Sequence, residues 1–167
     1  MTTDKARSND TGGIMHKTTM AKTLLAALSK VEQFLAAIDT SIINQAQNSY
    51  MHYTSTQKTM EDIIDNMHKK RLLNNLRIKT ERLLEAAPHN FRRVLILAYI
   101  HQLPAKKIAE IIKKTERTVF RYLRDGLAWF ADRINKVVDN YDFACIMTQE
   151  TWLRNIYNRL RSEKKPK

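Results

Sequence analysis

The sequence predicts an all-α protein, and three features of its composition and patterning support this class. Three glycines and three prolines in 167 residues are too few for the frequent turns of a many-stranded sheet. Leucine, isoleucine, alanine, lysine, arginine, glutamate and glutamine dominate, and most of these residues favour helices. Apolar residues also recur along the chain at spacings of three and four, which is the period of an amphipathic helix.

The N-terminal part is predicted to begin with a disordered stretch and to continue as one long helix. Residues 1–16 are mostly polar and contain two adjacent glycines, so we expect them to be disordered or to derive from an expression tag. From Lys17 onward, apolar residues form a seam with spacings close to a heptad repeat. The seam consists of Met20, Leu24, Leu28, Val31, Leu35, Ile38 and Ile42. It predicts one helix packed on a partner helix, either within the chain or in a second copy. A homodimer through the Leu24–Ile42 seam therefore stays open.

A second long helix is predicted after a polar loop. Residues 44–57 lose the apolar period and are rich in Asn, Gln, Ser and Thr, which is typical of a loop. The helix is expected to begin at Thr59, whose hydroxyl can cap the first turn. It should end near Glu85, because Pro88 disfavours helical geometry at the residue before it. Residues 17–87 would then form a helical part that serves oligomerisation or docking.

Three shorter helices are predicted within residues 88–136. The first covers Phe91–Gln102 and is mainly apolar. Pro104 suits the first position of a short second helix, because proline lacks the N–H that is unsatisfied there anyway. Thr115 is the expected N-cap of a third, longer helix.

The C-terminal residues 137–167 are predicted to form a tail helix followed by a basic tail. Thr148 is the expected cap of this helix, and Trp152 and Tyr157 should lie in the core or in an interface. Cys145 is the only cysteine, which excludes an internal disulfide. Its apolar neighbours indicate a buried, unreactive thiol.

The charge of the chain points to a polyanionic partner. The formal net charge is +12 and the pI is near 9.9. Such an excess attracts nucleic acids, anionic membranes and acidic proteins. The charge is also concentrated: between Leu103 and Arg124, seven Lys and Arg residues stand against Glu110 and Glu116. A basic face in the second half of the chain is therefore expected.

The densest part of this basic region has the pattern of a helix-turn-helix. It reads LPAKKIAEIIKKTERTVFRYLRDGL over residues 103–127, with a short helix, a turn and a longer helix. Ala109 is small and would let the two helix axes approach. Apolar residues of both helices would pack against Phe91–Gln102, which leaves the other face of the longer helix outward. The packing residues are Ile108, Ile112, Val119 and Leu123.

This stretch resembles region four of bacterial sigma factors and related helix-turn-helix activators. The matching positions, in order, are Leu103, Ile108, Ala109, Glu110, Thr115, Thr118, Val119 and Leu123. The resemblance covers Pro88–Ile134, and the layout is nearest to phage-encoded late-gene regulators of Gram-positive hosts. Lys113 and Lys114 stand where the family usually has Gly and an apolar residue. A lysine at the glycine position implies a different turn geometry or local strain.

The expected function is sequence-specific DNA binding by a transcriptional regulator, with the longer helix in the major groove. The base-edge contacts are expected from Arg117, Phe120 and Arg121. The phosphate contacts are expected from Lys106, Lys113, Lys114, Thr115 and Arg124. One alternative is a sigma-like module that docks on RNA polymerase, which the resemblance also implies. The other is a helical adaptor that binds an acidic protein instead of DNA.

Other kinds of site are weaker candidates. Glu61, Asp65 and His68 share a helical face, but acids near a helix start are explained by its dipole, so no metal site is predicted. Tyr50, His52 and Tyr53 could stack on bases, although aromatic residues that close a loop are commoner. No catalytic motif or cofactor signature is present, so we predict a protein that is not an enzyme and has no cofactor.

The sequence also predicts a cytoplasmic protein without a membrane partner. The first fifteen residues lack the apolar core of a signal peptide. The longest apolar run, Val94–Ile100, is far too short to cross a bilayer.

Overall fold

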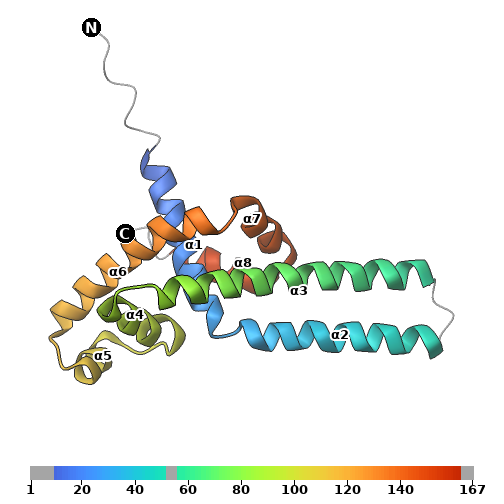
Figure 1. Cartoon of the computed structure of the whole chain (residues 1–167), viewed down its shortest axis with the longest axis horizontal. Helices are drawn as coiled ribbons and strands as arrows, with labels where there is room; N and C mark the ends of the chain where they lie inside the picture. Colours follow the sequence, from blue (N-terminus) through green and yellow to red (C-terminus); the bar gives the residue numbers. More distant parts are fainter. Residues whose placement is uncertain (1–9, 52–55, 163–167) are drawn as a thin grey trace, which may run out of the picture.

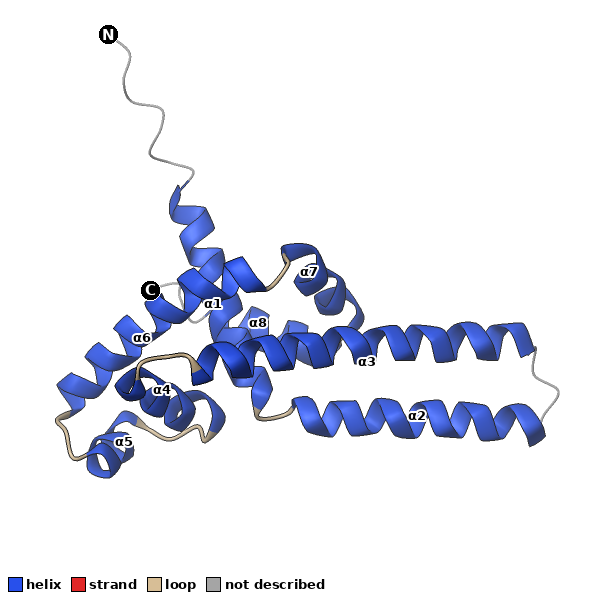
Figure 2. Ribbon diagram, in the orientation of Figure 1, coloured by secondary structure: helices blue, strands red, loops and turns tan. Residues whose placement is uncertain are grey.

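A computed structural model describes residues 10–51 and 56–162, and all the regular structure in these ranges is helical, which confirms the all-α class (Figure 2). The helices are α1 (Asp10–Leu28), α2 (Val31–Met51), α3 (Thr56–Glu85), α4 (His89–Leu95), η1 (Ile96–Ile100), α5 (Ala105–Ile112), α6 (Glu116–Val137), α7 (Asn140–Gln149) and α8 (Thr151–Ser162). η1 is a π-helical continuation of α4.

Helices α2 and α3 lie side by side and project together from the rest of the molecule (Figure 1). Polar contacts join them along their length. The Asn66 amide donates to the Gln45 side chain at 3.1 Å, Lys70 pairs with Asp39, and Arg77 pairs with Glu32 at 3.1 Å. We call the projecting part, residues 38–51 and 56–71, the arm.

One main hydrophobic core joins α1, α2, α3, α4, α6, α7 and α8, and α1 lies at its centre. Helix α1 contacts α3, α6 and α8. Its most deeply buried side chains, each at most 2% exposed, include Leu25, Leu73, Leu95, Phe130, Ile146 and Leu153. Burial of a side chain of this size stabilises the fold by about 1.5–3 kcal/mol. This core contains residues on both sides of positions 87/88 and 136/137.

A second, smaller cluster holds α4, α5 and α6 together. It consists of Val94, Ile108, Ala109 and Val119, each less than a tenth exposed. Leu123 and Ile112 are partly buried and pack against it, as the sequence pattern predicted. This cluster fixes the position of the basic stretch relative to α4.

The predicted seam helix is wrong as a single element, because it breaks at Ser29 and Lys30 into α1 and α2. The Ser29 hydroxyl donates to the Ala26 carbonyl at 2.9 Å, and the Lys30 N–H donates to the Ala27 carbonyl. The break lets α1 enter the core while α2 follows α3.

The apolar seam residues therefore pack against other helices of the same chain. Leu24 and Val31 are each 4% exposed and Leu35 is 9% exposed. Because these side chains already contact the chain's own helices, a homodimer through the Leu24–Ile42 seam would require the core to open. The buried part of the seam is therefore not free to pack on a second copy.

Several N-terminal boundaries also differ from prediction. Helix α1 begins at Asp10, so the second half of the stretch expected to be disordered is helical. Helix α2 continues to Met51, and α3 begins at Thr56 rather than Thr59. The polar loop is therefore shorter than expected, because Asn and Gln are tolerated on an exposed helix. His52 and Tyr53 lie outside the described residues. The end of α3 at Glu85 is confirmed.

The C-terminal region holds two helices where one was predicted. Helix α7 is capped by Asp139, whose carboxylate accepts from the Tyr141 N–H at 2.9 Å. Thr148 lies inside α7, and the next helix begins at Thr151, so the predicted cap is wrong.

The aromatic residues of the tail pack as predicted. Trp152 stacks on Phe34 with ring centroids 4.1 Å apart, and Tyr157 meets Phe143 edge-on at 6.2 Å. Cys145 is only partly buried. The two ring contacts fix α8 against α2 and α7.

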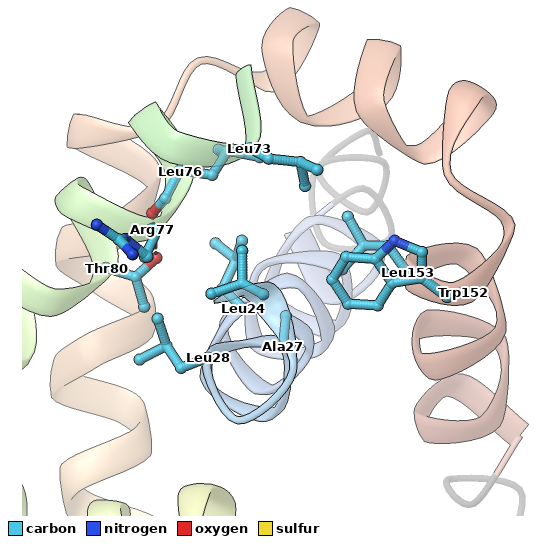
Figure 3. A pocket seen from close by; sticks show the side chains of 10 residues that line it. Leu24, Ala27, Leu28, Leu73, Leu76, Arg77, Thr80, Trp152 and Leu153 are labelled. Atoms are coloured by element: carbon cyan, nitrogen blue, oxygen red, sulfur yellow. Dashed lines mark hydrogen bonds between the residues drawn. The ribbon is translucent and has the colours of Figure 1, made fainter. Parts of the chain in front are cut away.

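A small cavity lies between α1, α3 and α8 (Figure 3). Leu24, Leu76 and Leu153 line it, and its volume is about 20 Å³. This is little more than the space of one water molecule. The cavity is a packing gap rather than a ligand site.

Candidate nucleic-acid interface

Helix α5 is anchored on its inner face by Ile108 and Ala109 and is exposed on its outer face. Ile108 is fully buried and Ala109 is 8% exposed, whereas Lys106, Lys107 and Glu110 face outward. Pro104 precedes the helix in an extended conformation, one position earlier than expected. The buried pair sets α5 against α4 and α6, so its lysines stay on the surface.

The turn after α5 has the backbone geometry that normally selects glycine. Lys113 is left-handed, with φ 55° and ψ 49°. The Lys114 N–H donates to the Ala109 carbonyl at 3.0 Å, and the Lys113 N–H donates to the Glu110 carbonyl at 3.3 Å. These two bonds form a Schellman motif, which ends α5 and satisfies its last carbonyls. Lys113 therefore adopts the backbone geometry that glycine favours, and left-handed backbone costs a non-glycine residue about 1–2 kcal/mol.

Helix α6 begins with the predicted cap. The Thr115 hydroxyl accepts from the Thr118 N–H at 3.3 Å and lies 3.0 Å from the Thr118 hydroxyl. Thr115 has an extended backbone, as an N-cap requires. Only three residues separate α5 from α6, so the cap and the left-handed turn together set the angle between the two helices.

All eight residues predicted to contact DNA are exposed, and they lie on two adjoining parts of the surface. Arg117, Phe120, Arg121 and Arg124 line one shallow depression on α6. The other four line a neighbouring depression around the turn, and they are Lys106, Lys113, Lys114 and Thr115. Thr118 borders both depressions. We call these eight residues the basic surface.

The cations of the basic surface are mostly free of intramolecular partners. Among the ion pairs between described residues, only Arg124 from this surface takes part, with Asp125 at 2.9 Å. The Arg121 guanidinium lies 5.6 Å from the centroid of the Tyr122 ring, within reach of a cation–π interaction. The positive charge is therefore available to an external anion.

Two residues that support this surface were not predicted. The Arg93 guanidinium donates to the Ile111 carbonyl at 3.3 Å and so ties α4 to the end of α5. Gly126 faces Phe91, and a Cβ atom there would lie 3.0 Å from the Phe91 Cβ. Glycine therefore permits the close approach of α4 and α6. Both contacts link positions far apart in the sequence, so no local pattern signals them.

Comparisons of the sequence and structure with protein-family models, curated proteins and solved structures returned no match. Within the described part of the chain, His, Cys, Asp and Glu side chains do not gather in groups of three suited to a metal ion, and this includes Glu61, Asp65 and His68. The same residues contain no helix that is both long and apolar enough to cross a membrane.

Proposed function

We propose that this protein is a cytoplasmic, sequence-specific DNA-binding transcriptional regulator. In this proposal α5, the Lys113 turn and α6 form a helix-turn-helix, and the first turns of α6 enter the major groove. The observation that carries the proposal is the basic surface, where Arg117, Phe120 and Arg121 face outward. They lie beside three lysines that form no ion pair with another described residue.

The dimensions of α6 are compatible with this docking. An α-helix with its side chains is about 10–12 Å in diameter. The major groove of B-DNA is about 12 Å wide and admits an α-helix. Arg117 and Arg121 lie one turn apart on the same face, so both guanidinium groups can reach base edges, and guanine is their preferred partner.

The turn would supply the phosphate contacts. Lys113 and Lys114 extend from the left-handed turn, and Lys106 lies on the same side of α5. Each lysine that neutralises a phosphate releases a counterion, so binding should weaken steeply as salt rises. The resemblance to sigma region four agrees with this division between a reading helix and a basic turn.

The proposal is tested by fluorescence anisotropy with short duplexes across a series of salt concentrations. The wild type should bind duplex DNA at low salt and lose affinity linearly on a double-logarithmic plot. The double variant Lys113→Gln/Lys114→Gln should bind all duplexes more weakly with a slope reduced by about two. The control Lys58→Gln removes one exposed charge at the far end of the arm and should leave binding unchanged. Absence of wild-type binding at low salt would refute the proposal.

A second function, docking on a protein, is favoured by Phe120. Its side chain is 58% exposed amid three arginines, and exposed aromatic residues beside arginine are enriched at protein interfaces. RNA polymerase and an acidic adaptor partner both belong to this class. Phe120→Ala should weaken a protein complex strongly while leaving non-specific DNA affinity unchanged. Displacement of the partner by excess duplex would show that the two ligands share the basic surface.

A further inference from the structure

The arm exposes a stripe of large apolar side chains on α3. Met60, Ile64 and Met67 follow at spacings of four and three, so they share one helical face. Their exposed fractions are 58%, 60% and 58%. Single exposed apolar residues are common on protein surfaces, but a contiguous row is typical of an interaction site.

Ile43 on α2 extends the same stripe. It is 56% exposed and lies one turn beyond Asp39. Asp39 pairs with Lys70, and Met67 lies one turn before Lys70 on α3. Because α2 and α3 run in opposite directions, Ile43 and Met67 follow this ion pair along the same side of the arm. We call Ile43, Met60, Ile64 and Met67 the arm patch.

Charges of opposite sign border the two ends of the arm patch. Glu61 lies beside Ile64 toward the tip of the arm, and Arg71 follows Met67 by one turn toward the body. The other charged residues of this stretch lie on other faces of α3, and Lys70 is already paired with Asp39. A two-fold rotation about an axis near the middle of the patch brings Glu61 of one chain close to Arg71 of another. The patch and its bordering charges therefore match a second copy.

We propose that the arm patch is a homodimer interface in which two α3 helices pack antiparallel. A two-fold axis between Asp65 and Asn66 sets Ile64 against Met67 of the second copy. It brings Glu61 close to the level of Arg71 of the second copy, which is exposed and has no ion pair among the described residues. The axis repeats each contact twice, as closed two-fold symmetry requires.

The position of the arm also suits a second copy. It projects from the body, so antiparallel arms would leave the two bodies at opposite ends (Figure 1). An acidic partner would be repelled by Glu61 and a basic partner by Arg71, whereas a second copy matches both charges. This interface does not depend on DNA binding.

The first test is the oligomeric state of the full chain without DNA, measured by sedimentation equilibrium over a wide range of concentrations. The wild type should show a reversible monomer–dimer equilibrium. Ile64→Gln removes an apolar contact on both copies and should raise the dissociation constant at least about tenfold. Val137→Gln changes an apolar side chain of α6 that is 45% exposed and lies outside the patch, so it serves as the control. A monomeric wild type, or an unchanged Ile64→Gln dimer, would overturn the proposal.

The second test uses charge reversal and does not depend on apolar substitutions. Glu61→Arg and Arg71→Glu should each weaken self-association, because like charges would then oppose each other across the interface. An equimolar mixture of the two variants should associate better than either alone, since every close pair regains opposite signs. Glu61 and Arg71 are both exposed, and circular dichroism verifies that each variant is folded. A mixture that associates no better than the separate variants would refute the antiparallel arrangement.

Discussion

Replacing Lys113 with glycine should stabilise the protein, because the turn already has the geometry that glycine prefers. Lys113 has φ 55°, and a left-handed backbone costs an ordinary residue about 1–2 kcal/mol. Glycine removes this cost but gains about 0.4–1 kcal/mol of conformational freedom in the unfolded chain. The difference predicts a stabilisation of a few tenths to about 1 kcal/mol.

The matched control is Lys114→Gly at the next residue. Lys114 is exposed like Lys113, but its φ is not positive. Glycine at this position increases the conformational entropy of the unfolded chain and relieves no strain in the folded state. The variant should therefore be destabilised by about 0.4–1 kcal/mol. Both variants lose one cation, so their affinities for DNA should fall by similar amounts with salt slopes reduced by about one.

Thermal unfolding and urea unfolding separate the two variants. For a chain of this size, 1 kcal/mol corresponds to about 2–4 °C in Tm. The two midpoints should therefore shift in opposite directions. If Lys113→Gly lowered stability as much as Lys114→Gly, the left-handed turn would be absent in solution.

Three further changes test the support of the basic surface. Thr115→Ala removes the cap of α6 and should cost about 0.5–2 kcal/mol of unfolding free energy in urea titrations, whereas Thr115→Ser should retain most of it. Gly126→Ala should lower the free energy of unfolding by about 1 kcal/mol or more, although alanine favours helices more than glycine does, because the new Cβ would lie 3.0 Å from the Phe91 Cβ. A stabilised variant would contradict this contact. Arg121→Ala should weaken binding to a preferred duplex by about 1–3 kcal/mol and spare a scrambled one, while equal losses on both would remove Arg121 from base reading.

The local sequence pattern predicted the structure correctly where a helix buries one distinctly apolar face. The end of α3 before Pro88, the cap at Thr115 and the buried pair Ile108 and Val119 all follow from spacing and residue type. In each case, the signal lies within a few residues of the feature it predicts. The exposure of Phe120 follows from the same helical period, because it lies next to buried Val119 on α6.

Local pattern failed where tertiary packing decided the structure. The heptad seam continues through Ser29 and Lys30 without glycine or proline, yet the chain breaks there so that α1 can enter the core. Helix α7 was not predicted, because a ten-residue helix has a weak apolar period. The approach of Phe91 to Gly126 and the bond from Arg93 to Ile111 join distant segments, which no window of sequence contains.

The main core holds the basic surface and the arm in a fixed relation, because both α6 and α3 are buried in it. Its C-terminal half is fixed in the main core by Phe130 and Ile134, and its first turns carry the basic surface. The same core holds α3 through Leu73 and Leu76, and α3 continues into the arm. The arm and the basic surface are therefore held in one orientation within each chain. If two arms pair as proposed, the two basic surfaces must lie at a fixed separation related by two-fold symmetry. Bound DNA would then carry inverted half-sites at constant spacing, and insertion of five base pairs between them should abolish the gain from dimerisation.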